Sequence, residues 1–166
     1  MTAWLGFSLA DQGKPTTIID GNSSSPRLHL AFRCPQRPGA ADLLENRASR
    51  TDALRPTSIE ALKLLPAGEM LSQKTGLSTE SWRELLQGLR SESRYVLVDA
   101  GKFGSAASLA VTLASDLVLL VVEAGKCRRE TVSKSVELLR KHRARILGVV
   151  LNKRRYRIPE FIYRRL

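Results

Sequence analysis

Apolar and polar residues divide the chain into two kinds of segment that follow one another in turn. Five short apolar runs predict strands, at residues 15–20, 61–68, 94–101, 115–125 and 144–153. Four segments with apolar residues at helical spacing predict helices, at residues 2–14, 76–92, 104–113 and 128–143. The Ser-rich residues 21–26 and the Pro-containing residues 33–39 are predicted to be loops.

The strand runs lack the alternation that is typical of a sheet with one solvated face. Neither VLVD (residues 96–99) nor LVLLVV (residues 117–122) alternates apolar with polar side chains, so we expect both faces of these strands to be buried. Strands of this kind with helices between them indicate a doubly wound α/β domain. The predicted architecture is a three-layer α/β/α fold with a mostly parallel sheet.

Two helical stripes predict part of the core. Trp4, Leu5, Leu9 and Ala10 form the apolar stripe of the first predicted helix. Trp82 lies on the corresponding stripe of the second predicted helix. We expect both tryptophans to pack in the core or between helix and sheet.

Polar residues end three of the predicted strands: Asp20 the first, Asp99 the third and Asn152 the last. Ligands of doubly wound sheets bind beyond the carboxyl ends of the strands, so these residues are candidates for one site at that edge. The alternative is that each residue caps the turn that follows it. His29 is interpreted as packing in its loop, because no carboxylate or nucleophile is spaced to work with it.

Composition adds one unusual feature, a net charge of +11 on 166 residues. Hydrophobic residues make up 43% and charged residues 26% of the chain, which is typical of a globular protein and not of a disordered one. No apolar run reaches the roughly 20 residues that span a bilayer, and no signal peptide precedes the first helix. We therefore expect a cytoplasmic protein. Cys34 and Cys127 lack the spacing of a metal site or a disulfide framework.

Cations are dense after the last predicted strand, where Glu160 is the one acid. These cations are Lys153, Arg154, Arg155, Arg157, Arg164 and Arg165. We expect residues 1–152 to form the α/β domain and residues 153–166 to form a basic tail. The tail predicts contact with an anionic membrane surface or with the cytoplasmic end of a membrane partner. A solvated charged surface is the plain alternative, and nucleic acid is the competing partner, although no sequence-reading motif supports it.

The residues carry a resemblance to a known family. The run from residue 20 to 29 (DGNSSSPRLH) with Phe32, the turn LKLLPAG, the strand RYVLVDAG and the closing strands SDLVLLVVEAGKCRRETV and RILGVVLNKRR occur in a matching order and spacing. In this order they resemble the cytoplasmic domain of bacterial polysaccharide-associated tyrosine kinases, the CpsD/CapB type within the MinD/ParA class of P-loop ATPases. The resemblance runs through almost the whole chain and implies a P-loop ATPase fold.

The resemblance also implies roles for the residues at the strand ends. Asp99 stands at the Walker B position for magnesium, and Asp20 begins the family's Asp-x-Asp pair. Asn22 replaces the second Asp of that pair, and Ser24 and Ser25 replace arginines. We expect Asp20, Asn22, Asp99 and Asn152 to form the remnant of a nucleotide and magnesium site, with Asp99 and Asp20 as the metal ligands if magnesium binds.

The family's phosphate loop is missing from the sequence. No GKS or GKT occurs, and GKPTT at residues 13–17 follows a predicted helix instead of preceding one. Without the loop, its Lys and the full acid set, little remains to catalyse phosphoryl transfer. We expect no cofactor for this chain, and ATP with Mg²⁺ if the missing segment is restored. Two explanations of the missing loop are truncation of a longer protein and natural loss of the loop, and we favour truncation.

The function that the resemblance implies is therefore a degenerate or truncated tyrosine-kinase-like protein. It is expected to assist or regulate exopolysaccharide or capsule biosynthesis and export, at the inner face of the membrane, without confident catalytic residues. Its expected partner is a membrane-bound polysaccharide chain-length or co-polymerase protein, and a homo-oligomer is a further possibility. Two alternatives are an active ATP-dependent tyrosine autokinase whose P-loop segment is absent from this sequence, and a ParA/MinD-like positioning module that binds DNA or membrane.

Lys102 stands three residues after Asp99, where the family has an uncharged proline. Two carboxylates left close together without a metal repel each other. We therefore expect one of two arrangements for Lys102. Its ammonium group either reaches back to Asp99 or Asp20, or extends into solvent.

Overall fold

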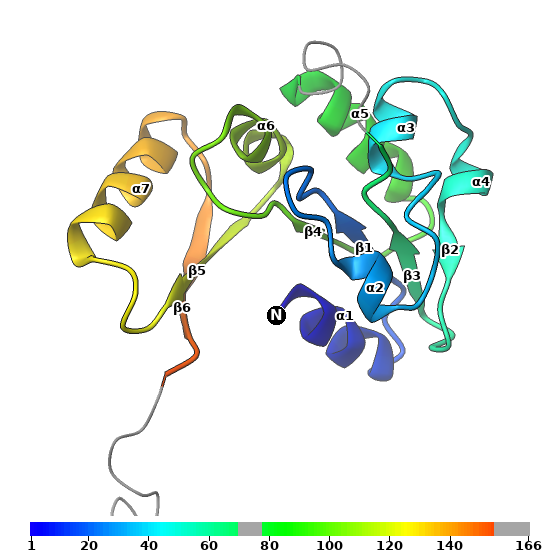
Figure 1. Cartoon of the computed structure of the whole chain (residues 1–166), viewed down its shortest axis with the longest axis horizontal. Helices are drawn as coiled ribbons and strands as arrows, with labels where there is room; N and C mark the ends of the chain where they lie inside the picture. The colour runs from blue at the N-terminus through cyan, green and yellow to red at the C-terminus, as the bar shows by residue number, and fades with distance from the viewer. Residues whose placement is uncertain (70–77, 155–166) are drawn as a thin grey trace, which may run out of the picture. The chain divides into compact units, whose positions relative to one another are not determined.

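The computed structural model describes residues 1–69 and 78–154 of the chain (Figure 1). The chain divides into two compact units, Met1–Ser115 and Asp116–Leu166. Each unit is described by itself below.

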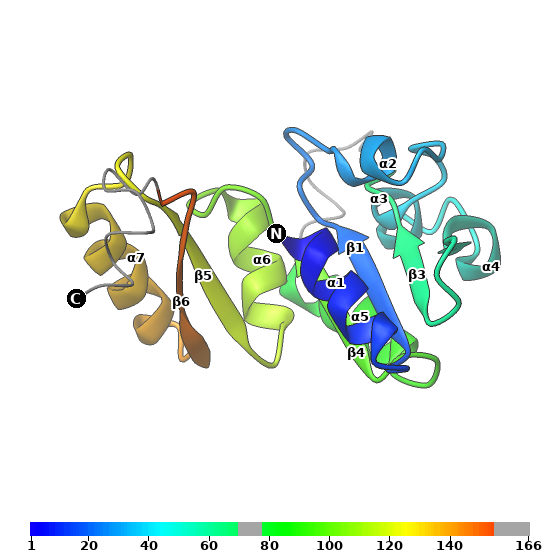
Figure 2. The ribbon, with the colours of Figure 1, turned by 90° about the horizontal axis from the view of Figure 1, so that it is seen from below.

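A four-stranded sheet forms the centre of the first unit (Figure 2). Strand β1 (Thr16–Asp20) lies between β3 (Leu62–Leu65) and β4 (Tyr95–Asp99) and is parallel to both. The short strand β2 (Arg55–Pro56) extends the sheet by pairing antiparallel with β3. The parallel part of the sheet confirms the α/β prediction.

Every residue of β1 is buried, because helices cover both of its faces. Ile18 belongs to one apolar cluster, which includes Ala10 of helix α1 (Thr2–Asp11). Ile19 belongs to a second cluster, which includes Trp82 of helix α5 (Thr79–Leu89) and Val111 of helix α6 (Ala106–Ala114). Consecutive strand residues point to opposite faces, so these clusters are the two core layers of a three-layer unit.

Helix α1 packs on the sheet through small residues. Its buried residues are Gly6 and Ala10, and a Cβ at Gly6 would lie only 2.3 Å from Cδ1 of Ile18. The close approach turns the large apolar residues outward, so that Trp4 is 77% exposed. The expectation that Trp4 packs in the core is therefore wrong, whereas Trp82, which is 4% exposed, confirms it for the second tryptophan.

Serine side chains cap the helices on the other face of the sheet. Ser78 Oγ accepts a hydrogen bond from the Ser81 N–H at the start of α5, and Ser105 Oγ accepts one from the Ser108 N–H at the start of α6. Such caps satisfy N–H groups that have no partner within the helix. They explain why the helices begin at Thr79 and Ala106, three and two residues after the predicted starts.

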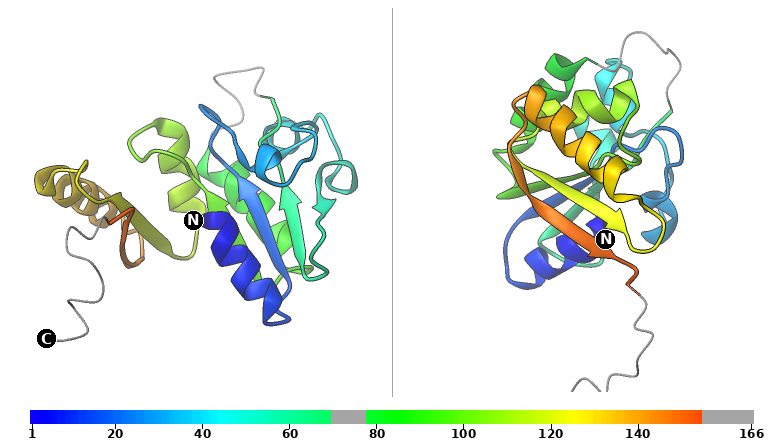
Figure 3. Two further views of the ribbon diagram at one scale, coloured as in Figure 1. Left: turned by 60° about the horizontal axis from the view of Figure 1, so that its bottom comes forward. Right: turned by 90° about the vertical axis from the view of Figure 1, so that its left-hand side faces the viewer.

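The second unit contains two parallel strands and the helix that connects them (Figure 3, right). Strand β5 (Val118–Glu123) pairs with β6 (Ile146–Asn152), and helix α7 (Arg129–Lys141) runs between them along the chain. Leu139 is the fully buried residue of α7. A strand, helix and parallel strand in this order form the βαβ unit that the sequence predicts for this region.

The strands β4 and β5 are less covered than expected. The residues of β4 are half-buried except the exposed Tyr95, and Val121 of β5 is 41% exposed. The prediction that both faces of these strands are buried is wrong here, because within its own unit neither strand has a residue that is fully covered. In those residues we also find no helix that is long and apolar enough to cross a membrane.

Four short elements were not predicted. They are α2 (Leu28–Ala31), α3 (Ala40–Leu44), α4 (Arg50–Ala53) and β2. All of them lie between β1 and β3, in a region that the sequence analysis left without regular structure. The predicted helices and strands are otherwise present, with ends that differ by a few residues.

Candidate functional site

Asp20 and Asp99 lie side by side at the carboxyl edge of the first unit's sheet. They are the last residues of β1 and β4, and the register pairs their Cα atoms directly. Parallel pairing fixes this arrangement, because equal steps along two neighbouring strands end at the same edge. The expected convergence of these two carboxylates is confirmed.

The Asp20 carboxylate is buried, with 2% of the residue exposed, and it holds the loop that follows β1. Oδ2 accepts hydrogen bonds from the N–H groups of Arg27 and Leu28, both at 2.9 Å. Oδ1 accepts one from the N–H of Asn22 at 3.2 Å. Both carboxylate oxygens therefore have partners within the loop.

Burial raises the pKa of the Asp20 carboxyl above its ordinary value of 3.8. The three backbone N–H groups lower this pKa, because they stabilise the ionised form, and the charge of Asp99 raises it. The net direction is upward. The loss of hydration is thus the largest influence on this carboxylate.

Asp99 is half-buried, and its carboxylate also has partners within the first unit. Oδ1 accepts a hydrogen bond from the N–H of Gly101 at 3.0 Å. Oδ2 lies 3.5 Å from the Thr2 hydroxyl, which is the donor. The first contact closes the turn after β4, and the second, longer one joins the start of α1 to the same edge.

Asn22 orders its own loop. Its Nδ2 donates to the Ser25 carbonyl at 2.9 Å, and its Oδ1 accepts from the Ser24 hydroxyl at 3.0 Å. Gly101, at φ +68°, packs against this side chain so closely that a Cβ would lie 2.6 Å from Asn22 Oδ1. A glycine is therefore required at position 101 for two reasons: the positive φ of its backbone and the lack of space beside the Asn22 amide. The two loops at this edge lie in direct contact.

Lys102 does not neutralise the two carboxylates. The residue is exposed, and within the described residues no ion pair within 4 Å joins its ammonium group to Asp99 or Asp20. The arrangement in which Lys102 reaches back is wrong, and the alternative of extension into solvent is confirmed. Hydrogen bonds from backbone N–H groups stabilise the carboxylates in its place.

Asn152 lies in the second unit, at the end of β6. Its Cα pairs with that of Glu123, and its Oδ1 accepts a hydrogen bond from the N–H of Lys153 at 2.9 Å. Its place beside Asp20 and Asp99 stays a prediction. Of the tail cations, Lys153 and Arg154 are described and exposed. The other tail cations lie outside the described residues: Arg155, Arg157, Arg164 and Arg165.

A small cavity lies beside Asp20. Its volume is about 20 Å³, and its lining includes Gly21, Ala40, Glu45 and Trp82. This volume is enough for about one water molecule. The Trp82 indole N–H has no hydrogen-bond partner in the part of the chain that the structure describes. The position of Trp82 at this cavity was not expected, since the helical stripe predicts only that the residue is buried.

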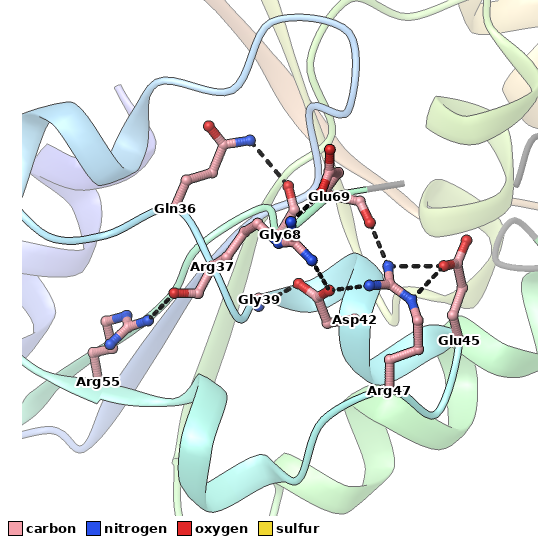
Figure 4. Close-up of polar contacts among 9 residues, drawn as sticks. All are labelled: Gln36, Arg37, Gly39, Asp42, Glu45, Arg47, Arg55, Gly68 and Glu69. Carbon is pink, nitrogen blue, oxygen red and sulfur yellow. Dashed lines mark hydrogen bonds and ion pairs between the residues drawn. The ribbon is translucent and has the colours of Figure 1, made fainter. Parts of the chain in front are cut away.

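The residues around Asp42 form a second polar cluster, which the sequence analysis did not predict (Figure 4). The buried Asp42 carboxylate accepts from the Gly39 N–H at 2.9 Å and from Arg47 Nη1 at 2.5 Å. Arg47 also donates to Glu45 at 2.8 Å and to the Glu69 carbonyl. We call these residues, with Arg37, the Asp42 cluster. It joins α3 to the segment that follows β3.

Backbone contacts reinforce the same junction. The Ala40 N–H donates to the Pro66 carbonyl at 2.7 Å, and the Ala41 N–H donates to the Ala67 carbonyl at 2.9 Å. Gly39 lies so close to this segment that a Cβ would be 2.2 Å from the Gly68 nitrogen. The Asp42 cluster is therefore a structural anchor at the same sheet edge as Asp20. His29, which lies nearby in sequence in α2, is half-buried, and its Nδ1 has no partner in the described ranges.

Comparisons with known proteins agree with this fold. The model of the family described as "Cellulose biosynthesis protein BcsQ" matches residues 1–142. A putative tyrosine-protein kinase CapB of Staphylococcus aureus is 28% identical over 156 residues, which cover 92% of this chain and 68% of the relative. The tyrosine-protein kinase CpsD of Streptococcus agalactiae is 25% identical, with 90% and 66% covered. The chain thus spans about two thirds of the length of these relatives.

Solved structures give the same result. The chimerical protein CapA2B2 matches with a TM-score of 0.85 at 26% identity, covering 93% of this chain and 70% of the other. The VpsO kinase domain matches with a TM-score of 0.79 at 27% identity, covering 93% and 77%. The septum site-determining protein MinD of Pyrococcus horikoshii, complexed with Mg-ADP, matches with a TM-score of 0.76 at 21% identity, covering 99% and 69%. The last likeness shows the fold alone. The predicted MinD-like P-loop NTPase fold and the tyrosine-kinase resemblance are confirmed.

Proposed function

The chain belongs to the BcsQ family of cellulose biosynthesis proteins, and from this premise we propose that it assists or regulates the biosynthesis and export of an exopolysaccharide. Its relatives are named as bacterial tyrosine-protein kinases, and its fold is that of the MinD-type P-loop ATPases. The proposed partner is a membrane-bound polysaccharide co-polymerase. In this proposal the chain acts by binding that partner and not by phosphoryl transfer.

The second half of this proposal rests on the sequence, which holds no GKS or GKT loop for the phosphates. The backbone N–H groups of its own loop donate to both oxygens of Asp20, so this carboxylate has a structural role at the edge. Asn22, which replaces a carboxylate of the related kinases, uses its amide oxygen within the same loop. The edge is thus held in shape by its own hydrogen bonds.

The described residues do not fit a Mg-ATP complex. Phosphate binding in this fold requires a glycine-rich loop with a Lys and a Ser or Thr hydroxyl, and the sequence holds no GKS or GKT. We therefore assign no catalytic step to Asp20 or Asp99, and we regard them, with Asn22 and Asn152, as the remnant of a nucleotide site.

Calorimetric titration of the chain with Mg-ATP tests the binding half of the proposal. We expect no saturable heat at micromolar nucleotide, because the phosphate loop is missing. A micromolar dissociation constant that the exchange Asp99→Asn abolishes would overturn the proposal, since it would show a working metal site at this edge.

Genetic complementation tests the biological half. We expect deletion of the gene to lower the amount of extracellular polysaccharide, and we expect the Asp99→Asn variant to restore it as fully as the unchanged gene does. The carboxylate contributes no chemistry in this proposal, so its exchange is harmless if the variant folds, which circular dichroism checks. Failure of a folded Asp99→Asn variant to complement would contradict the non-catalytic role.

The names of the relatives favour one second candidate, an ATP-dependent tyrosine autokinase of which this chain is a part. An in-frame GKS or GKT loop directly upstream of Met1 in the gene would support this candidate. The longer protein would then incorporate radiolabelled phosphate from ATP into tyrosine. Tyr156 and Tyr163 are the tyrosines near the end of this chain, and both lie outside the described residues.

A further inference from the structure

The indole N–H of Trp82 is a buried donor to which the site described above gives no role. Trp82 is 4% exposed, and within the described residues its Nε1 has no hydrogen-bond partner. A buried donor without an acceptor destabilises a fold, because it has lost its hydration and gained nothing in return. Most such groups in native proteins are therefore paired, either with a protein atom or with an ordered water molecule.

The cavity beside Asp20 adjoins this indole. Trp82 is part of its lining, and its volume is about 20 Å³. A cavity needs roughly 10–15 Å³ of such volume to hold a water molecule, so this one has the size for a single water. All of its lining residues belong to the first unit, so the cavity is a feature of that unit by itself. Four of them are alanines, whose small side chains leave this space: Ala40, Ala41, Ala67 and Ala107.

Three polar side chains share this lining with Trp82, those of Asp20, Ser23 and Glu45. Ser23 is exposed, and Glu45 lies 2.8 Å from Arg47. Asp20 is buried, and within the described residues its Oδ1 accepts one hydrogen bond, from the Asn22 N–H. A carboxylate oxygen can accept two, so Oδ1 has room for one more donor.

The two groups that face the cavity decide the chemistry of its occupant. A small apolar ligand would leave the Trp82 donor unpaired, and a cation offers no lone pair to it. An anion would accept from the indole but would lie beside the Asp20 carboxylate, which is unfavourable. Water can accept from the indole N–H and donate to the carboxylate at the same time.

We propose that one ordered water molecule occupies this cavity and bridges Trp82 and Asp20. It accepts a hydrogen bond from the indole N–H and donates one to a carboxylate oxygen of Asp20. The water thereby joins helix α5 to the carboxyl edge of the sheet, where the loop after β1 begins. This inference stands on the first unit alone and does not depend on the polysaccharide role proposed above.

A crystal structure of the chain, at a resolution that shows ordered water, tests the geometry. We expect a water molecule within about 3.2 Å of Trp82 Nε1 and of an Asp20 carboxylate oxygen. A cavity without water would overturn the proposal. A water that contacts one of the two side chains but not the other, or an indole N–H bonded directly to a protein acceptor, would do the same.

Nuclear magnetic resonance tests for the water in solution. The chain has two tryptophans, and Trp4 is 77% exposed, so the variant Trp4→Phe leaves the indole signal of Trp82 alone. We expect a rotating-frame Overhauser effect between this indole proton and water, with a sign opposite to that of hydrogen exchange. The effect should persist in the further variant Ser23→Ala, which excludes relay through that hydroxyl. Lack of the effect in the Trp4→Phe variant, or its loss on Ser23→Ala, would contradict the bound water.

Filling the cavity gives a matched pair of variants in the Trp4→Phe background. Ala107 lines the cavity, whereas Ala106 is exposed in the same turn of α6 and does not line it. We expect Ala107→Val to abolish the Overhauser effect, because the added methyl groups displace the water, and we expect Ala106→Val to retain it. Circular dichroism checks that both variants are folded. An effect that persists in a folded Ala107→Val variant, or that both exchanges abolish, would refute the assignment of the water to this cavity.

Discussion

Removal of the Asp42 carboxylate is expected to destabilise the first unit more than any exchange of an exposed acid. The side chain of Asp42 is 4% exposed, and its two oxygens accept from the Gly39 N–H and from Arg47. In the variant Asp42→Ala these two donors lose their acceptor. The Gly39 N–H is buried, so water does not replace the lost oxygen.

The magnitude follows from these contacts. Removal of one partner from a buried ion pair costs about 3–5 kcal/mol, because the other charge stays without compensation. The Arg47 side chain is 26% exposed and regains some hydration, which places the expected loss for Asp42→Ala at the lower end, about 3 kcal/mol. Arg37 lies 3.9 Å away with a side chain that is 55% exposed, so its share is small. Asp42→Asn keeps an acceptor for the Gly39 N–H and should cost about 1–2 kcal/mol.

Equilibrium unfolding in urea measures both losses. We expect the order Asp42→Ala, then Asp42→Asn, then a control exchange of the exposed acid Glu84→Gln, which should lie within about 0.5 kcal/mol of the unchanged chain. A double-mutant cycle with Arg47→Gln isolates the ion pair. A loss below about 1 kcal/mol for Asp42→Ala would refute the reasoning, since it would mean that the Gly39 N–H finds another acceptor.

Two further predictions concern the same edge of the sheet. The variant Gly39→Ala should lower the free energy of unfolding in urea by more than about 2 kcal/mol. The new Cβ would lie 2.2 Å from the Gly68 nitrogen and 2.4 Å from the Pro66 carbonyl oxygen, which are both backbone atoms. A loss below about 1 kcal/mol, which is about the entropic difference between Gly and Ala, would contradict this prediction. The pKa of Asp20 is raised in the folded chain, so the folded chain binds this proton more tightly than the unfolded chain does. This carboxyl therefore makes the free energy of unfolding fall as the pH rises from 3.8 through the folded pKa. Urea unfolding across this range should show a smaller fall for Asp20→Asn, and an unchanged pH dependence would contradict the assignment.

Local patterns in the sequence were sufficient to predict the long elements. The apolar run TTIID and the capped segment that begins at Ser78 each carry one clear periodicity, and they form β1 and α5. The short helix α4 spans four residues, Arg50–Ala53, which is too few for a helical period to emerge. Its cap, Ser49, differs in no way from a serine of an ordinary turn.

The orientation of α1 shows where a stripe of large apolar residues is misleading. The pattern of Trp4 and Leu5 predicts that this face is buried, but the approach of two elements depends on their smallest residues as well. Gly6 allows α1 to come within contact of Ile18, and in this orientation Trp4 lies on the exposed side of the helix. Sequence periodicity does not contain this information, because it depends on the shape of the opposing surface.

The candidate site separates in the same way into predictable and unpredictable parts. The pairing of Asp20 with Asp99 follows from the ends of two parallel strands, and the sequence was sufficient to predict it. The contacts to the N–H groups two positions further on are those that the turn-capping alternative predicts. The N–H groups seven and eight positions after Asp20, and the Thr2 hydroxyl beside Asp99, were not predictable from local sequence. Lys102, the nearest cation in sequence to Asp99, was the natural choice of partner, but the structure directs it into solvent.

The choice of N–H groups over a cation has a physical reason. Lys102 would lose hydration and side-chain freedom to reach a buried carboxylate, whereas the N–H groups of Arg27 and Leu28 must find acceptors in any case. Asp20 gives these donors their acceptor, and the donors offset part of the cost of its burial, which still keeps its pKa above the ordinary value. The shape of this edge is therefore set by hydrogen bonds within the first unit.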